Sequence, residues 1–401
     1  MRRAAWATIL LATLALAAAV GAPEQELSLL DGRGLRGSLT SIDARQVVIQ
    51  AGGKAETLPR DEVITITFVH SAPPDLLTEP GRKVLLTDDG SRFGVSEVTL
   101  AGGTLSATNP AAGAIRVPLE RVVRLLVPRT GERPADLQRQ CDTLGLKRGA
   151  TDYVVISNKP GQYAPVAGVL KTLDSKQIVF QYEGAETAMD AATVAVIQTA
   201  GASAAPAAPA GELECPDGSR IAFADATFAS GKVRLTGTAA GELTVAAGSI
   251  AALRFRSAKF AYLSDLAPAE ARQVGYFGES QPHVKDRAVG GGPLVLGGTR
   301  FEKGLGLHTR CELTWDLGGQ YRRLVATAGI DDASPLGTAY LTILGDGKPL
   351  VSRLRLDRKA APQPVAVDVS GVKRLVVLAE FGDGGFGAGE RVDLADAKLI
   401  R

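Results

Sequence analysis

The sequence is poor in aromatic residues and in the side chains that most often carry catalysis. Of its 401 residues, 5% are aromatic, and only three are histidines. The 45 Lys and Arg residues nearly balance the 43 Asp and Glu residues, so charge gives no basis for predicting nucleic acid as a partner. The sequence also lacks a G-x-S-x-G nucleophile motif and histidine-rich metal spacing. We therefore predict a protein with no catalytic residues.

Cysteine is too rare for a disulfide framework. Cys141, Cys215 and Cys311 are widely separated and odd in number, so at most one pair could form. A chain with 45% hydrophobic residues can bury more than one core without such a bond. We therefore expect buried free thiols. The 46 glycines, in turn, favour β structure with many tight turns.

The first 22 residues are typical of a signal peptide. Arg2 and Arg3 form a basic start, residues 7–20 form an apolar run, and small residues follow up to Ala22. The run is shorter than the about 20 apolar residues that a membrane-spanning helix needs. We expect export to the periplasm, the cell envelope or the exterior, with cleavage between residues 19 and 23. No membrane span is expected after cleavage.

Four similar segments follow, at residues 24–70, 82–128, 151–199 and 212–257. Each opens with a turn pair that ends in a glycine: Gly32, Gly90, Gly161 or Gly218. Each closes with a pattern of two aligned apolar residues: Val63 and Ile66, Val122 and Leu125, Val194 and Ile197, Ile250 and Leu253. The turn glycine precedes the first aligned residue by 31 to 33 positions in every segment. We interpret the segments as four β-repeats.

Each repeat alternates apolar and polar residues between Gly, Asp and Asn turns, which predicts four or five short strands. Strands of this length can close as a small barrel that resembles SH3-like or Sm-like folds. Such a module buries little core alone, so the copies are expected to pack together. The array is either a spacer or assembly scaffold, or a set of peptide- or ligand-binding barrels through which a protein partner could bind. Two connectors interrupt it, a short helix at residues 133–149 and an Ala/Pro linker at residues 200–211.

The pattern changes in residues 258–401, where longer alternating segments predict an antiparallel β-sandwich. We interpret residues 307–317 as one strand with an apolar face that includes Cys311 and Trp315. These two side chains are therefore predicted to be buried structural residues. His308 begins that strand and is predicted to fix a loop through a hydrogen bond to the backbone.

Several motifs in this region resemble one family. They are "YLSDL" (262–266), "GGPLVLGGTRFEKGLGLHTRCELTWDLGGQYRRLVATAGIDD" (291–332), "DGKPL" (346–350) and "GERVDLADAKL" (389–399). In order and spacing they are similar to the NPCBM family of carbohydrate-binding modules, first noticed beside family 98 glycoside hydrolases. The resemblance implies a galactose-binding-like jelly-roll sandwich that binds glycan. The family usually has an aromatic residue where this sequence has Leu394.

Sugar-binding modules commonly stack a sugar ring on an aromatic side chain and fix its hydroxyls with polar groups. The candidates for stacking are Tyr276, Phe277 and Phe386. The candidates for polar contacts are Asp331, Asp332 and Arg391. The alternatives are that the aromatic pair covers the end of the sandwich and that the two aspartates cap a turn.

No cofactor is required by these patterns, but one acidic loop could hold a structural Ca²⁺. Its candidate ligands are Asp383, Glu390 and Asp393, which carry the oxygen atoms that Ca²⁺ prefers. The alternative is an ordinary solvated turn.

Together these observations predict an exported, non-catalytic protein whose C-terminal sandwich binds a glycan or a cell-envelope polysaccharide. Two alternatives stay open: a structural or protein-interaction scaffold without sugar binding, and an accessory part of a glycoside hydrolase system. A glycoside hydrolase itself is disfavoured, because the repeats and the sandwich leave no residues for a catalytic domain with two carboxylates across a cleft.

Overall fold

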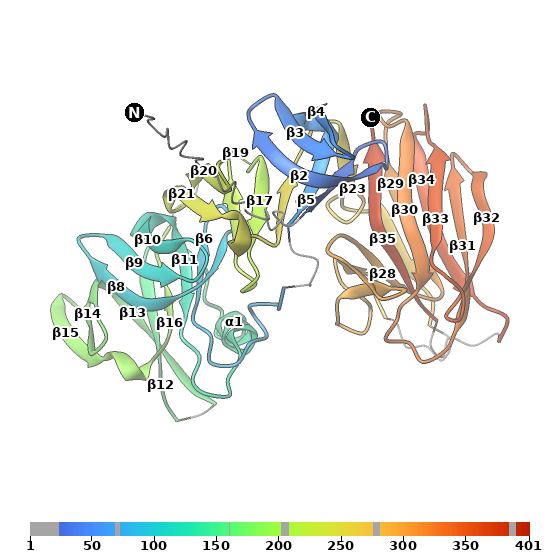
Figure 1. Cartoon of the computed structure of the whole chain (residues 1–401). Helices are drawn as coiled ribbons and strands as arrows, with labels where there is room; N and C mark the ends of the chain where they lie inside the picture. Colours follow the sequence, from blue (N-terminus) through green and yellow to red (C-terminus); the bar gives the residue numbers. More distant parts are fainter. Residues whose placement is uncertain (1–23, 69–72, 160, 202–207, 276–280, 385–389) are drawn as a thin grey trace, which may run out of the picture.

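The computed structural model describes residues 24–68, 73–159, 161–201, 208–275, 281–384 and 390–401. The predicted signal peptide lies outside these residues. The fold is all-β, with one body of strands from residues 25–255 and a second from residues 260–400 (Figure 1). In the described ranges, no helix is long and apolar enough to cross a membrane.

Each predicted repeat contains one group of strands. The first group contains β1 (Gln25–Leu29), β2 (Gly34–Ile42), β3 (Gln46–Ala51), β4 (Lys54–Pro59) and β5 (Val63–Thr67). The second contains β6 (Val84–Thr87), β7 (Arg92–Gly94), β8 (Ser96–Ala101), β9 (Thr104–Asn109), β10 (Gly113–Pro118) and β11 (Val122–Leu126). The third contains β12 (Asp152–Lys159), β13 (Gln162–Leu173), β14 (Gln177–Tyr182), β15 (Ala185–Asp190) and β16 (Val194–Gln198). The fourth contains β17 (Gly211–Glu214), β18 (Arg220–Phe223), β19 (Asp225–Ala229), β20 (Lys232–Thr238), β21 (Gly241–Ala246) and β22 (Ala252–Phe255).

The four groups share one strand order, in which the last strand pairs with the first. The first group runs β5-β1-β2-β3-β4, and the third runs β16-β12-β13-β14-β15. In the second and fourth groups the long second strand is split, into β7 and β8 and into β18 and β19. A single 3-10 turn lies just before the last strand in every group. These turns are η1 (Arg60–Glu62), η2 (Leu119–Arg121), η3 (Ala191–Thr193) and η4 (Ala247–Ser249).

The first aligned residue of each repeat follows that 3-10 turn directly. Val63, Val122, Val194 and Ile250 are all buried, with at most 5% of the side chain exposed. An apolar residue at this position anchors the turn in the core and sets the register of the strand that follows. The constant interval in the sequence therefore corresponds to a constant structural position.

The second aligned residues lie opposite one another in two antiparallel strand pairs. Between β5 and β22, Ile66 pairs with Leu253, and between β11 and β16, Leu125 pairs with Ile197. Equivalent residues face each other across an antiparallel pair only when a local two-fold axis relates the two repeats. The first and fourth repeats thus form an outer pair, and the second and third form an inner pair.

Further contacts close both pairs and join them. Ile42 in β2 pairs with Phe228 in β19 of the outer pair, and Leu100 in β8 pairs with Leu173 in β13 of the inner pair. Apolar side chains from all four repeats form one cluster of buried residues. The two pairs meet where Arg92 in β7 lies opposite Arg220 in β18.

The predicted connecting helix is α1 (Pro134–Thr143). It buries Leu137 and Cys141 in a separate apolar cluster with strands of the inner pair. The helix ends before Gly145, whose φ of +66° is the left-handed conformation that stops a helix, so it is shorter than the predicted 133–149. All three cysteines of the chain are buried and unpaired.

The C-terminal body is a sandwich of two antiparallel sheets. One sheet has the order β25-β28-β35-β30-β33, with β23 paired to β35, and the other has the order β24-β29-β34-β31-β32. The first contains β23 (Phe260–Tyr262), β25 (Val284–Lys285), β28 (Gly304–His308), β30 (Arg323–Ile330), β33 (Gln363–Asp368) and β35 (Arg391–Ile400). The second contains β24 (Glu270–Gln273), β29 (Cys311–Asp316), β31 (Thr338–Gly345), β32 (Lys348–Asp357) and β34 (Arg374–Phe381). A small hairpin, β26 (Leu294–Leu296) with β27 (Thr299–Phe301), lies beside them.

The interpretation of residues 307–317 as one strand is wrong. β28 ends at His308 in one sheet, and β29 begins at Cys311 in the other, so the chain crosses between the sheets at Thr309 and Arg310. Leu307, before the crossing, and Trp315, after it, both face the common core. Both sheets bury their inner faces against each other. The alternation of apolar and polar residues therefore continues from one sheet to the other, and in the sequence it resembles that of a single strand.

Candidate functional site

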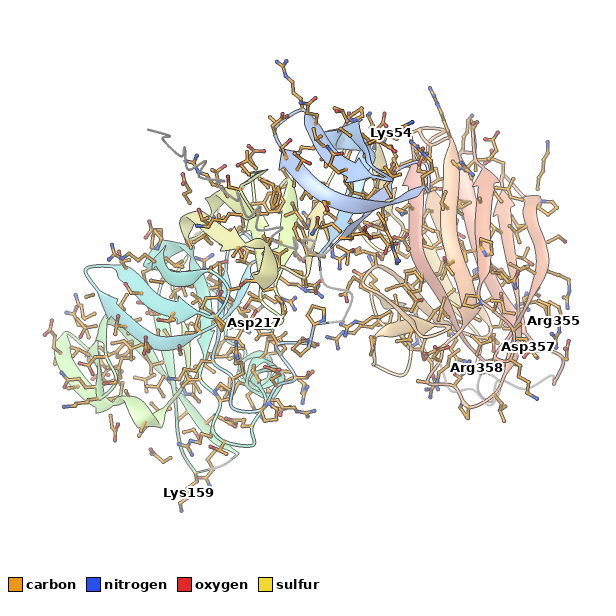
Figure 2. All side chains as sticks on the ribbon, viewed as in Figure 1. Lys54, Lys159, Asp217, Arg355, Asp357 and Arg358 are labelled. Atoms are coloured by element: carbon orange, nitrogen blue, oxygen red, sulfur yellow. The ribbon has the colours of Figure 1, made fainter. Side chains whose placement is uncertain are left out.

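Several strands of the sandwich end or begin at the same end of the molecule. β30, β32 and β34 end there, and β31 and β35 begin there. Figure 2 shows Arg355, Asp357 and Arg358 at this end of the sandwich. Residues that are distant in the sequence therefore meet around a shared set of loops, which is where binding residues are commonly placed on a rigid scaffold.

A shallow depression of about 350 Å³ lies among these loops. It is lined by Leu336, Gly337, Thr338, Asp357, Arg358, Lys359, Gly384 and Glu390. Leu336 is 59% exposed, which is unusual for a large apolar side chain. The depression therefore combines an apolar surface with cationic, anionic and hydroxyl groups. That combination suits a polar ligand with one apolar face.

Arg358 is held rigidly at this depression. Its guanidinium donates to the carbonyl oxygens of Ser334 at 3.1 Å and Asp332 at 3.2 Å, and lies 3.4 Å from the Asp332 carboxylate. The same carboxylate accepts hydrogen bonds from the backbone N–H groups of Gly297 at 3.1 Å and Gly298 at 2.7 Å. Asp332, a predicted sugar contact, is thus already engaged, and it positions Arg358.

A second network fixes the neighbouring strands. Asp383 accepts hydrogen bonds from the Tyr340 hydroxyl at 2.6 Å and from Arg355 at 2.9 Å. These two donors, Tyr340 first, hold the pKa of Asp383 below its usual range. Arg355 also contacts Asp357 at 2.9 Å. The carboxylate of Asp383 therefore neutralises a local guanidinium.

Glu390 is buried beneath the loops, with 2% of its surface exposed. One carboxylate oxygen accepts a hydrogen bond from the Thr309 hydroxyl at 2.5 Å, and the other accepts one from the backbone N–H of Gly382 at 3.0 Å. The residue therefore ties the sheet crossing at Thr309 to the end of β34.

Asp331 and Asp393 form a buried pair of carboxylates. They are 1% and 0% exposed, and Asp331 Oδ2 and both Asp393 oxygens lack hydrogen-bond partners among the described residues. Burial, and then the charge of Asp331, raise the pKa of Asp393 to about 8. Asp331, a predicted sugar contact, thus has only 1% of its surface exposed. It follows β30 in sequence but turns into the interior.

Arg391, another predicted polar contact, does not line the depression. The Arg391 guanidinium lies close to the backbone of Gly290. A Cβ atom added to Gly290 would lie 2.8 Å from Arg391 Nη1. The three predicted calcium ligands do not converge: in the described part of the chain, no three His, Cys, Asp or Glu side chains lie close enough to hold a metal ion. Tyr276, Phe277 and Phe386 lie outside the described residues.

The three predicted structural residues surround the sheet crossing. Trp315 is 2% exposed, and its indole N–H donates to the Leu266 carbonyl at 3.4 Å. Cys311 is 1% exposed, and burial raises the pKa of its thiol to about 12. The Nδ1 atom of His308 lies 2.7 Å from the carbonyl oxygen of Thr309.

Sequence reasoning missed the residues that line the depression except Glu390, which it predicted as a calcium ligand. Asp357, Arg358 and Lys359 form a run of three charges directly after β32. Such a run is common in a solvated turn, so in the sequence it does not indicate a binding site. The exposed Leu336, isolated in "SPLG", was the one available indication.

A family model matches the C-terminal part of this chain. Residues 259–400 match the model of the NPCBM/NEW2 domain, which confirms the resemblance found in the sequence. A Renibacterium salmoninarum protein named "Putative endo-alpha-N-acetylgalactosaminidase" is 37% identical over 99 residues, which are 23% of this chain. The matched stretch spans only 7% of that protein's length.

Three solved structures show partial similarity to this chain. A CBM51 module from Clostridium perfringens GH95, in complex with methyl-galactose, is 22% identical over 35% of this chain and 99% of its own, with a TM-score of 0.32. The CBM51-2 and INT domains of Clostridium perfringens ZmpB, in complex with GlcNAc, are 22% identical over 45% of this chain and 40% of their own, with a TM-score of 0.32. Tandem CBM51 modules of a Streptococcus pneumoniae family 98 glycoside hydrolase are 12% identical over 94% of this chain and 87% of their own, with a TM-score of 0.31.

Proposed function

We propose that this is an exported, non-catalytic carbohydrate-binding protein whose C-terminal sandwich binds a glycan. The observation that carries the proposal is the match of residues 259–400, the whole sandwich, to the NPCBM/NEW2 domain. The glycan would bind in the depression at the loop end, between Leu336 and Arg358.

The chemistry of the depression supports a neutral or weakly polar sugar. A sugar ring has an apolar face of C–H groups, which Leu336 can cover, and an edge of hydroxyls. Arg358 and Lys359 offer donors to those hydroxyls, and Asp357 offers an acceptor. Because Asp332 and two carbonyls already fix Arg358, little side-chain entropy would be lost when a sugar binds.

A glycan array probed with the full mature chain tests this proposal. Arg358→Ala and Leu336→Ala should each weaken binding of the glycans found by about tenfold, which corresponds to one charge-assisted hydrogen bond or one apolar contact. Lys348→Ala is the matched control, because Lys348 is exposed at the opposite end of β32. Equal binding by Arg358→Ala and Lys348→Ala would show that the depression is not the site.

The non-catalytic assignment has its own test. No pair of carboxylates in the depression has the open arrangement of a glycosidase, because Glu390 is bonded through both oxygens to Thr309 and Gly382. Glycans retained on the array should be recovered uncleaved after long incubation. Release of a reducing sugar would support the alternative that the chain takes part in hydrolysis.

The N-terminal repeats are proposed as a spacer that presents the sandwich, which is also the basis of the alternative scaffold function. One edge strand of each repeat pairs with that of another repeat inside the chain, β5 with β22 and β11 with β16, which supports a role in which these edges recruit no further strands. Export is supported by the basic and apolar pattern of residues 1–22. Mass spectrometry of the protein from the envelope or medium should find an N-terminus between residues 19 and 23.

A further inference from the structure

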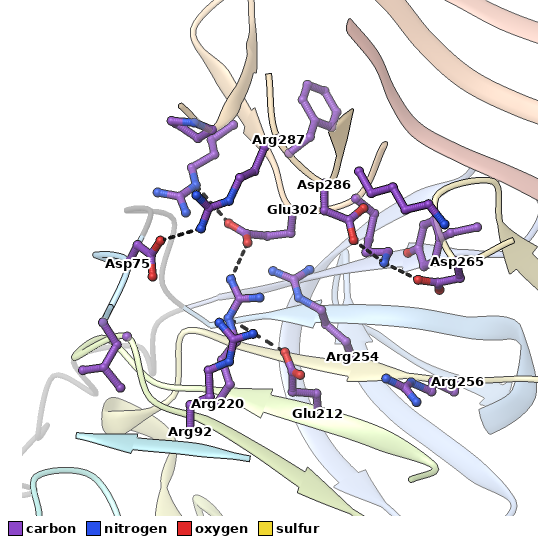
Figure 3. Close-up of a pocket in the computed structure, with 18 of the residues that line it drawn as sticks. Asp75, Arg92, Glu212, Arg220, Arg254, Arg256, Asp265, Asp286, Arg287 and Glu302 are labelled. Atoms are coloured by element: carbon purple, nitrogen blue, oxygen red, sulfur yellow. Dashed lines mark hydrogen bonds and ion pairs between the residues drawn. The ribbon is translucent and has the colours of Figure 1, made fainter. Parts of the chain in front are cut away.

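A second, larger cavity lies between the repeats and the sandwich. Its volume is about 870 Å³, and its walls come from β7, β17, β18 and β22 on one side and from residues 285–303 of the sandwich on the other. Figure 3 shows arginines from both sides reaching into the same space. The cavity exists only because the two bodies of the chain are assembled.

The charges that line this cavity do not balance. Eight Arg and Lys residues face five Asp and Glu residues. The buried Glu214 stands behind the wall, 3.0 Å from Arg220 and 2.8 Å from Arg254, and even with its charge the surroundings of the cavity stay positive. A positive, partly enclosed space concentrates field lines and attracts anions.

The anionic groups of the cavity are already engaged. Glu302 contacts Arg220 at 2.5 Å and Arg300 at 2.9 Å, and Asp75 contacts Arg287 at 3.0 Å. Burial would raise the pKa of Glu302, but Arg220 and then Arg300 hold it below its usual range. The pairs of Glu302 with Arg220 and of Asp75 with Arg287 join the N-terminal body to the sandwich, and the pair of Glu302 with Arg300 lies within the sandwich.

Two of the arginines have no such partner. Among the described residues, the guanidiniums of Arg92 and Arg256 make no hydrogen bond and no ion pair, although both line the cavity. Arg92 also lies directly opposite Arg220 across the β7–β18 pair, and like charges in that position repel. Partial desolvation, and then the Arg220 charge, lower the pKa of Arg92. The charge of Arg92, which lies beside that of Arg220, is therefore not neutralised by an ion pair within the described residues.

We propose that this cavity binds an acidic saccharide, whose carboxylate, sulfate or phosphate groups are held by Arg92 and Arg256 on two sides of the cavity. A guanidinium offers paired donors whose geometry matches such an oxyanion, so each unpartnered side chain can bind one anionic group of the saccharide. The proposal rests on the proposed function for the class of ligand, a glycan, but it uses a different cavity and different residues.

The walls also suit a sugar ring better than a bare anion. Phe255, Phe260 and Phe301 line the cavity beside the charged groups. Phe301 is half-buried, so part of its surface can cover the apolar face of a sugar. A volume of about 870 Å³ is far more than one phosphate or sulfate ion fills.

The test uses the full mature chain and calorimetric titration with four probes: oligogalacturonate, a heparin oligosaccharide, inorganic phosphate and a neutral oligosaccharide of similar length. Arg92→Ala/Arg256→Ala is the test variant. Arg116→Ala/Arg323→Ala is the matched control, because it removes the same charge from two exposed arginines that lie outside the cavity.

At least one acidic oligosaccharide should bind to wild type and to the control, and binding should weaken by at least about tenfold in the test variant. The uronate and sulfate probes distinguish the sources of the anionic group. The melting temperature of the empty test variant should equal or exceed that of wild type, since a repulsion is removed. Wild type should melt higher with the probe, and the test variant should not.

Three results would overturn the proposal: no acidic probe binds to wild type, the test and control variants weaken binding equally, or phosphate binds as tightly as the oligosaccharides. Failure of the proposed function is a separate result. The proposed function fails if the neutral glycans found on the array bind equally to wild type and Arg358→Ala. That result does not depend on the binding of acidic probes in the cavity.

Discussion

Replacement of Asp393 by Asn should change how the stability of the sandwich depends on pH. Asp393 is fully buried, both of its carboxylate oxygens lack partners, and its pKa is raised to about 8 from the usual 3.8. Between these two pH values the folded protein keeps a proton that the unfolded chain releases. The stabilisation from this proton is therefore complete below pH about 4, falls as the pH rises, and is lost above about 8.

The size of the effect follows from the pKa difference. Each unit of difference corresponds to about 1.4 kcal/mol, so wild type should lose up to about 4 kcal/mol from this group between pH 5 and pH 8. Asparagine has the same shape, is neutral at every pH, and can donate to the unpartnered Oδ2 of Asp331. Asp393→Asn should thus match wild type near pH 4 and be clearly more stable at pH 8.

Urea unfolding in EDTA, followed by tryptophan fluorescence, measures this difference. Of the two tryptophans, Trp6 lies in the predicted leader, so Trp315 alone reports on the sandwich of the mature chain. A gap between the two proteins that stays constant from pH 5 to pH 8 would refute the reasoning. A rise in wild-type stability when Ca²⁺ is added at pH 8, absent in Asp393→Asn, would instead support the predicted calcium ligand.

Three further predictions concern the cores. Trp315→Ala should destabilise the sandwich by about 3 to 5 kcal/mol in circular-dichroism melts, because a buried indole leaves a cavity; a loss below about 1 kcal/mol would contradict its burial. His308→Ala should cost only about 1 to 2 kcal/mol, from one hydrogen bond, and leave glycan binding unchanged; lost binding in a stable variant would show a direct role. Leu253→Lys should separate the outer repeat pair and make β5 and β22 exchange amide hydrogens rapidly, whereas exposed Lys232→Leu should not.

The fold could largely be predicted because its signals are local and repeated. Period-two alternation and turn glycines indicated strands, and the constant spacing to Val63 and its equivalents indicated repeats. What the alternation could not show is which edges pair. The contact of β5 with β22 joins strands at opposite ends of the array, and nothing near Ile66 in the sequence specifies Leu253 as its partner.

The candidate site was harder to predict for a related reason. Asp331 and Asp332 are adjacent at the end of a strand, yet one turns into the core and the other positions Arg358. The different positions of these two side chains depend on loops from elsewhere in the chain. The interdomain cavity is harder still, because Arg92 and Arg256 read as ordinary surface charges until the repeats and the sandwich are assembled.

The nesting of the repeat pairs sets an order on synthesis. Along the chain, the two repeats of the inner pair lie between the two repeats of the outer pair. The ribosome therefore synthesises β5 long before β22, its partner strand. β5 has the sequence VITIT, in which every residue is β-branched, and a free edge of this kind readily pairs with other chains. The inner pair can close meanwhile, through β11 and β16. Release of the chain before residue 252 would therefore leave an aggregation-prone edge uncovered, and β22 protects the protein as well as completing a sheet.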